Sequence, residues 1–214
     1  EAAKDCGLKL IVGSEFRTAD DLHIVLLAPT QRAYAQICQL ITTARRRANK
    51  GLYQLSRSDF AANLDECFAL WIPPADPLFS QASWIRERFP ERAWIAAELH
   101  RGANDKTRLQ SLRELAERAN LRMVATGDVH MHVKERRALQ DTVTAIRHGC
   151  TLANAGHRLF PNGERYLRPY DELRSVYPAD LLQETLTIAS RCDFSLDSLR
   201  YHYPEELVPA GKTA

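Results

Sequence analysis

The stretch LRMVATGDVHMH, residues 121–132, decides how we interpret the fold. Its residues 123–125 form a short apolar run typical of a buried parallel strand, and Gly127, Asp128 and His130 follow directly. Because side chains on a strand alternate between its faces, Asp128 and His130 can point the same way and offer a metal one oxygen and one nitrogen ligand. The alternative is that Asp128 caps the next helix and the histidines are surface residues. For Asp-x-His alone this alternative has the greater weight, because short motifs match often.

The segments around this stretch alternate between strands and helices. The helix expected over residues 134–148 is amphipathic, and we expect Leu139, Val143 and Ile146 on its buried stripe. Short loops between alternating elements predict a mostly parallel α/β sheet or barrel. The expected strands cover residues 8–16, 22–28, 67–73, 92–100 and 121–128. The other expected helices cover residues 30–49, a short segment after Ser56, residues 78–88, and a segment ending near Ala119.

The two ends of the chain differ from this alternating part. The start, EAAKDCG, is typical of the last turns of a helix that ends at Gly7, so we expect a fragment of a longer protein. After Gly149 we expect a helix over residues 179–192 but no further strong strand, and residues 203–214 have the composition of a linker. We therefore divide the chain into a main domain, residues 1–150, and residues 151–214, which we expect to complete this domain with helices and to end in a linker toward a following domain.

Composition restricts the class of protein. The chain has 214 residues, of which 45% are hydrophobic and 26% charged, as expected for a soluble globular protein. No apolar run approaches the roughly 20 residues that cross a bilayer, so we expect no membrane partner. The five cysteines are scattered and odd in number, which favours reduced thiols and the cytoplasm. A net charge of +2 does not by itself indicate nucleic-acid binding. We interpret the basic cluster Arg45, Arg46, Arg47 and Lys50 as a solvated helix end.

Ionisable residues recur where the expected strands end. Glu15, His100, Asp128 and His130 all occupy such positions, although they are far apart in the sequence. In (β/α) barrels the carboxyl ends of the strands lie together, so these side chains are expected to converge. His23 lies at a strand start and fits this arrangement only if its strand is antiparallel or belongs to a neighbouring edge.

Several motifs together indicate a family. GSEF (13–16), LHIVLLA (22–28), AELH (97–100) and GDVHMH (127–132) resemble the PHP (polymerase and histidinol phosphatase) domain of bacterial C-family DNA polymerases. ITTARRRANKG (41–51), HMHVKERRALQDTVTAIRHG (130–149), LFPNGERYLRP (159–169) and LRYHYPEELVPAG (199–211) are more similar to the error-prone, DnaE-like (ImuC-type) polymerases than to the replicative ones. The resemblance covers essentially the whole chain.

The resemblance implies a distorted (β/α)7 barrel, truncated at its amino end, whose strand ends hold zinc, manganese or iron ions. The family's ligands correspond to Glu15, His23, His100, Asp128 and His130, with His132 beside them. The family's first His-x-His motif and its next ligands would precede Glu1, so the chain would hold about half of a site. The three catalytic aspartates of the palm domain would follow Ala214, so nucleotide addition is not expected here.

The implied parent protein is a cytoplasmic, magnesium-dependent, DNA-directed DNA polymerase for error-prone translesion synthesis and damage-induced mutagenesis. Its expected partners are DNA, deoxynucleotides, the sliding clamp and accessory proteins of a mutagenesis cassette. The PHP site itself would be a metal-dependent phosphoesterase or 3′–5′ exonuclease. Two alternatives remain open: a stand-alone phosphatase acting on a small ester such as histidinol phosphate, and a scaffold that binds no metal.

Overall fold

One five-stranded sheet organises the computed structural model, which describes residues 2–61 and 63–200. The strand order follows the sequence, β1-β2-β3-β4-β5, and the predicted strands are all present. The strands are β1 Gly13–Arg17, β2 His23–Leu27, β3 Phe68–Trp71, β4 Ala93–Glu98 and β5 Arg122–Thr126. The predicted linker, residues 203–214, lies outside the described residues.

Strand direction departs from the mostly parallel sheet that the sequence predicts. β2 is antiparallel to both of its neighbours, whereas β3, β4 and β5 are mutually parallel. The α/β class is therefore confirmed, but the sheet is mixed, and the strands of the described chain form an open row rather than a closed barrel. Closure into a PHP-type barrel stays a prediction.

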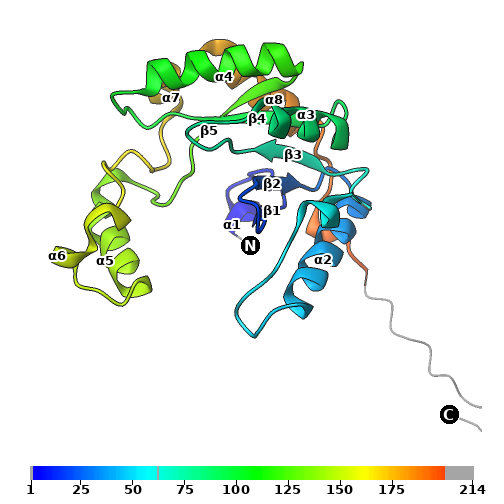
Figure 1. Cartoon of the computed structure of the whole chain (residues 1–214), viewed down its shortest axis with the longest axis horizontal. Helices are drawn as coiled ribbons and strands as arrows, with labels where there is room; N and C mark the ends of the chain where they lie inside the picture. Colours follow the sequence, from blue (N-terminus) through cyan, green and yellow to red (C-terminus); the bar gives the residue numbers. More distant parts are fainter. Residues whose placement is uncertain (1, 62, 201–214) are drawn as a thin grey trace, which may run out of the picture.

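Helices α2, α3 and α4, which are labelled in Figure 1, pack on one face of the sheet and build the larger part of the core with it. Leu40 of α2, Ile85 of α3 and Leu112 of α4 pack in one buried cluster with Ile24 and Trp71 of the sheet. The side chain of Thr30 caps α2 by accepting a hydrogen bond from the Ala33 amide, as the sequence predicts. The helices are α1 Ala2–Asp5, α2 Gln31–Arg46, α3 Phe79–Arg88, α4 Asp105–Ala119, α5 Arg137–Arg147, α6 Leu152–Ala155, α7 Tyr170–Val176 and α8 Ala179–Ser190. The 3-10 turns are η1 Arg57–Phe60, η2 Lys134–Arg136, η3 Gly156–Arg158 and η4 Leu196–Ser198.

The opposite face of the sheet has a smaller apolar cluster. Phe68, Trp94 and Val124, from three adjacent strands, lie on this face and pack against Ile188 of α8. The Trp94 indole donates a hydrogen bond of 2.6 Å to Glu184, also on α8. Because strand side chains alternate, Glu15 of β1, His23 of β2 and Glu98 of β4 lie on the same face of the sheet as this cluster.

The amino-terminal segment matches its prediction in part. Helix α1 ends before Gly7, whose φ of 64° is the left-handed conformation that glycine adopts without strain. The first strand, however, begins at Gly13 rather than at Leu8. Leu8 and Leu10 are 68% and 57% exposed, so the apolar run before Gly13 does not pack in the described core.

The segment after β5 differs most from the prediction. The sequence predicts that Leu139, Val143 and Ile146 are buried on one stripe of a helix, and this prediction is wrong: the stripe of α5 faces solvent in the described chain. The helix itself is confirmed, preceded by η2. Two further helices, α6 and α7, were not predicted, since both are very short.

The buried cluster under α4 predicts that truncating two leucines, one buried and one exposed, has very different effects on the free energy of unfolding. Leu112 of α4 is 0% exposed, whereas Leu186 of α8 is 61% exposed. Leu112→Ala leaves a cavity and is expected to lower the free energy of unfolding by about 2–5 kcal/mol. Leu186→Ala, the matched control, is expected to change it by less than about 1 kcal/mol. Urea unfolding of both variants measures the difference, and equal losses would contradict the position of α4 over the sheet.

Candidate metal half-site at the sheet edge

The predicted ligands lie at one edge of the sheet. The carboxyl ends of β1, β3, β4 and β5 meet there, and because β2 is antiparallel to β1 and β3, its amino end lies at the same edge. His23, the first residue of β2, therefore lies beside β1. The sequence allows His23 to join the other predicted ligands if its strand is antiparallel, and β2 is antiparallel.

Glu15 and His23 form the first pair of predicted ligands. Glu15 lies opposite Val25 in the ladder, two positions from His23, so the two side chains share a face. The Nε2 atom of His23 lies 2.6 Å from Oε1 of Glu15. The His23 side chain is 14% exposed and that of Glu15 is 53% exposed, so the pair opens toward solvent on the carboxylate side.

The end of β4 contributes His100 and a second acid, Glu98. Burial raises the pKa of the Glu98 carboxyl, the positive charge of Arg165 opposes the rise, and the negative charge of Glu15 adds to it. Burial and then Arg165 lower the pKa of His100, against the effect of its hydrogen bond to Gly127. His100 is therefore neutral at pH 7, the form of imidazole that binds metals.

A hydrogen bond orients the His100 ring. Its Nε2 atom lies 3.1 Å from the carbonyl oxygen of Gly127, which directly follows β5. A carbonyl only accepts, so Nε2 carries the proton and Nδ1 keeps its lone pair free. This arrangement, in which one ring nitrogen is held by the backbone and the other is free, is common among metal-binding histidines.

Asp128 and His130 follow β5 and form the second pair. Oδ1 of Asp128 lies 3.1 Å from Nε2 of His130. Asp128 has a φ of 40°, a left-handed conformation unusual for a residue other than glycine. The alternative that Asp128 caps the following helix is wrong: η2 begins after Val133 and has no side-chain cap. The other oxygen of Asp128, Oδ2, instead forms an ion pair with Arg165.

A loop from the carboxyl-terminal part of the chain, residues 159–168, fixes the ends of β4 and β5. The carbonyl oxygen of Arg165 accepts hydrogen bonds from the amides of His130, at 2.9 Å, and of Met131, at 3.1 Å. The side chain of Asn162 donates a hydrogen bond of 2.6 Å to the carbonyl oxygen of His100. This loop therefore positions both strand ends that carry predicted ligands.

The five ligands do not yet form a complete metal site. Within residues 2–61 and 63–200, no group of three or more His, Cys, Asp or Glu residues is close enough to hold a metal ion. The ligands instead form the pairs Glu15–His23 and Asp128–His130, with His100 bonded to the backbone. Three imidazoles and two carboxylates nevertheless match the donors that zinc, manganese and iron use. The donor set therefore fits part of a metal site, and its ligand roles remain predictions.

Sequence reasoning missed Glu98, Glu164 and Arg165. Glu98 had a usable signal, since it is two residues before His100 and alternation places it on the face of Trp94 and Glu15. Glu164 and Arg165 had none, because a loop contact between distant parts of the chain leaves no periodic pattern. Both were part of the motif LFPNGERYLRP, but without an assigned role.

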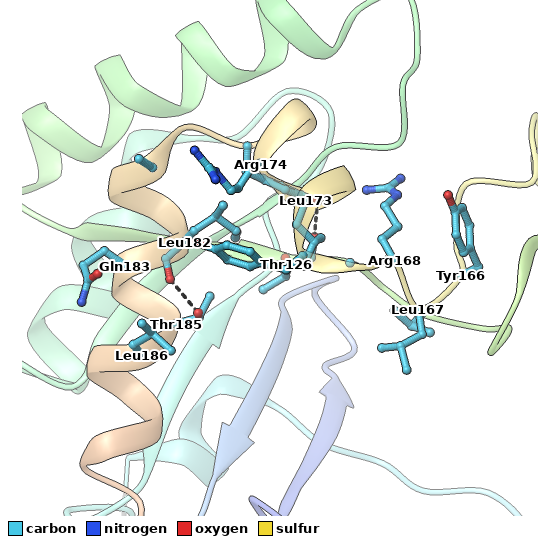
Figure 2. A pocket seen from close by; sticks show the side chains of 16 residues that line it. Thr126, Tyr166, Leu167, Arg168, Leu173, Arg174, Leu182, Gln183, Thr185 and Leu186 are labelled. Carbon is cyan, nitrogen blue, oxygen red and sulfur yellow. Dashed lines mark hydrogen bonds between the residues drawn. The ribbon is translucent and has the colours of Figure 1, made fainter. Parts of the chain in front are cut away.

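A separate pocket of about 550 Å³ lies beside β5, and none of the five predicted ligands lines it. Figure 2 shows Leu182 and Leu186 of α8 on one side and Arg168 on the other. The Arg168 side chain is only 2% exposed, and its Nε atom has no hydrogen-bond partner among the described residues. The buried Oγ1 atom of Thr126, on β5, likewise has no partner in the described part of the chain.

The remaining sequence predictions concern surface residues and cysteines. Arg45 donates to the carbonyl oxygens of Gly51 and Leu52, and Arg47 pairs with Asp59, so two members of the basic cluster stabilise the end of α2. His132, beside the predicted ligands, is exposed, as are His148 and His157, which have no predicted ligand role. All five cysteines are unpaired. Among the described helices, none has the length and apolar character to cross a membrane.

Comparison with known proteins identifies the relatives of this chain. The error-prone DNA polymerase of Pseudomonas fluorescens is 53% identical over 214 residues, which are 100% of this chain and 21% of that protein. The error-prone DNA polymerases of Dechloromonas aromatica and Methylococcus capsulatus are 51% and 52% identical, each over 99% of this chain. This chain is homologous to a segment of the error-prone DNA polymerases. No protein-family model matches it.

The homology confirms the resemblance to error-prone polymerases that the sequence motifs indicated. The chain spans about one-fifth of the length of the error-prone polymerases that it matches. Most of the length of those relatives thus lies outside the aligned segment, so the activity of the whole protein cannot be assigned to these residues alone. The PHP assignment and the metal ligands remain predictions.

The ion pairs of Glu164 are expected to contribute to the free energy of unfolding in a pH-dependent way. Burial would raise the pKa of this carboxyl, but the hydrogen bond and charge of Lys134 and the charges of Arg168 and Arg101 hold it below its usual value of 4.5. Because the pKa is lower in the folded state, the stabilisation is present above pH 4.5 and is lost as the pH falls through the folded-state pKa. Glu164→Gln is therefore expected to lower the free energy of unfolding by about 1–3 kcal/mol at pH 7 and by less in acid.

Urea unfolding across this pH range measures the effect of Glu164→Gln. Glu135→Gln is the control, because Glu135 is exposed and forms no ion pair in the described part of the chain. A loss for Glu164→Gln that stays constant down to pH 3 would contradict the proposed electrostatic origin.

Proposed function

We propose that this chain is the PHP-type module of an error-prone, DnaE-like DNA polymerase and that its sheet edge provides one half of a divalent-metal site. The carrying observation is the reversal of β2, which places His23 2.6 Å from Glu15 at the edge where β4 and β5 end. Three residues from the other strand ends, His100, Asp128 and His130, lie at that edge. The names and identities of the relatives support the polymerase context.

The remainder of the metal site would come from the rest of the polypeptide. In a PHP-type barrel, further strands lie between β5 and β1, and each of these has only one strand partner in the described sheet. The pocket beside β5 supports this proposal, because it exposes apolar side chains and leaves polar atoms of Thr126 and Arg168 without partners among the described residues. Buried polar groups are nearly always hydrogen-bonded in complete proteins, so an added segment would satisfy them.

The residues present have distinct roles in such a site. Glu15 orients His23, the Gly127 carbonyl keeps the Nδ1 lone pair of His100 available, and Asp128 and His130 form a third contact region. A bound divalent cation would supply activated water and charge neutralisation for phosphoester hydrolysis, including 3′–5′ exonuclease cleavage. The low pKa of His100 favours metal binding, since its imidazole remains neutral at pH 7.

The whole polymerase would use magnesium, DNA and deoxynucleotides in a catalytic domain outside these residues. By the same resemblance it would act in the cytoplasm, in damage-induced mutagenesis and translesion synthesis, with a sliding clamp and accessory proteins. A stand-alone phosphatase fits less well, because the relatives that match this chain are about five times longer and are named as polymerases.

A metal-free scaffold is the second candidate, and a specific contact favours it. Arg165 forms an ion pair with Asp128, and its charge opposes the rise that burial causes in the pKa of Glu98, so a guanidinium already neutralises part of the acidic edge. In this alternative the module supports the rest of the polymerase without chemistry of its own.

Metal content distinguishes the two candidates. Elemental analysis of the full-length polymerase should find zinc, manganese or iron, and the double variant Asp128→Ala, His130→Ala should lose it. His157→Ala, which removes an exposed histidine that is not one of the five predicted ligands, is the control and should retain the metal. Absence of metal from all three proteins would support the scaffold.

A further inference from the structure

Helix α5 presents an apolar stripe to solvent. Leu139, Val143 and Ile146 follow one another at spacings of four and three residues, so they lie on the same helical face. Their exposed fractions are 54%, 44% and 72%. Single exposed apolar residues are common on protein surfaces, but three aligned on one strongly amphipathic helix indicate a contact surface.

The opposite face of α5 is already occupied. Ala145 is 4% exposed, and Arg137 donates a hydrogen bond of 3.0 Å to the carbonyl oxygen of Phe160 and pairs with Asp141. The main neighbours of α5 are η2 and α6. Figure 1 shows α5 and α6 at the lower left, away from the sheet and joined to it by extended segments. The stripe therefore has no sheet surface onto which it folds in the described chain.

Two arginines border the stripe. Arg136 lies just before α5 and Arg147 at its end, and the side chain of neither forms an ion pair or a hydrogen bond with residues 2–61 or 63–200. Complementary interfaces pair an apolar centre with an apolar surface and place opposite charges around it. Glu135, next to Arg136, is also exposed and forms no ion pair in the described part of the chain, so the rim carries a net positive charge. The surface that covers the stripe is therefore expected to be apolar with an excess of acidic residues at its rim.

We propose that the α5 stripe is an intramolecular interface that docks onto an apolar, acid-rimmed surface elsewhere in the longer polymerase polypeptide. The homologous segment is 21% of the relative from Pseudomonas fluorescens, so ample chain exists to provide that surface. Three side chains form a small patch, whereas stable contacts between separate molecules bury more than about 1,000 Å². A covalent connection raises the effective concentration to the millimolar range, so a small patch suffices within one polypeptide.

The test uses the full-length polymerase with a cysteine placed on or beside the stripe. Val143→Cys reports on the stripe, and Ala138→Cys is the matched control, since Ala138 is exposed on the same helix but on a different side. Ile146→Cys is a second reporter. Alkylation by N-ethylmaleimide is followed peptide by peptide by mass spectrometry, so the native cysteines, including the five of this segment, do not interfere. Each rate is divided by the rate of the same site in urea.

The proposal predicts that the cysteines at 143 and 146 react at least about tenfold more slowly than the cysteine at 138. Rates within about twofold of one another would overturn it. A photo-crosslinking residue at position 143 then identifies what covers the stripe. The expected product is a monomer crosslinked to a peptide outside these 214 residues. Crosslinking to a second copy, or to a peptide of the present chain, would also overturn the proposal. Neither result depends on the metal content.

Discussion

The reversed direction of β2 is the constraint on which the candidate site depends. If β2 ran parallel to its neighbours, its first residue would lie at the opposite edge of the sheet, and His23 would be separated from Glu15 by the length of the strand. The antiparallel ladders on both sides fix this direction. The apolar side chains of Ile24 and Leu26 point into the core under α2, so alternation turns His23 to the other face.

The strands and helices of this fold follow from local sequence patterns, whereas the direction of β2 depends on contacts between strands. The strands were predictable because each is a short apolar run followed by a turn or a polar segment, and the helices because of their periodicity and the Thr30 cap. Strand direction was not predictable from one sequence, since the apolar pattern of β2 is the same in either direction. Only the position of His23 pointed to the antiparallel arrangement.

In the candidate site, too, some residues could be recognised from local sequence and others could not. Glu15, His100, Asp128 and His130 were recognisable because ionisable residues directly after apolar runs mark strand ends. The loop that holds them was not, because Asn162 and Arg165 act through contacts across the chain. The burial of α5 was predicted wrongly for a related reason: periodicity shows that Leu139, Val143 and Ile146 share a face, but not which surface covers it.

Homology with the error-prone polymerases gives these incomplete features a common explanation. Paired ligands, strands β1 and β5 with one partner each, unpaired polar atoms beside β5 and an exposed apolar helix face are all expected where a longer polypeptide continues the structure. Each is costly for an isolated domain, because buried polar groups need partners and exposed apolar stripes favour association. We therefore propose that this chain is one structural part of a polymerase and that residues elsewhere in that polymerase would complete the metal site.

Anomalous X-ray diffraction from crystals of the full-length polymerase, measured at the zinc, manganese and iron absorption edges, would locate a metal ion at this edge of the sheet. We predict an anomalous peak about 2.0–2.2 Å from ring nitrogens of His100 or His130, with further ligands from outside these residues. An ordered edge without any anomalous peak, in which Arg165 still pairs with Asp128, would contradict it.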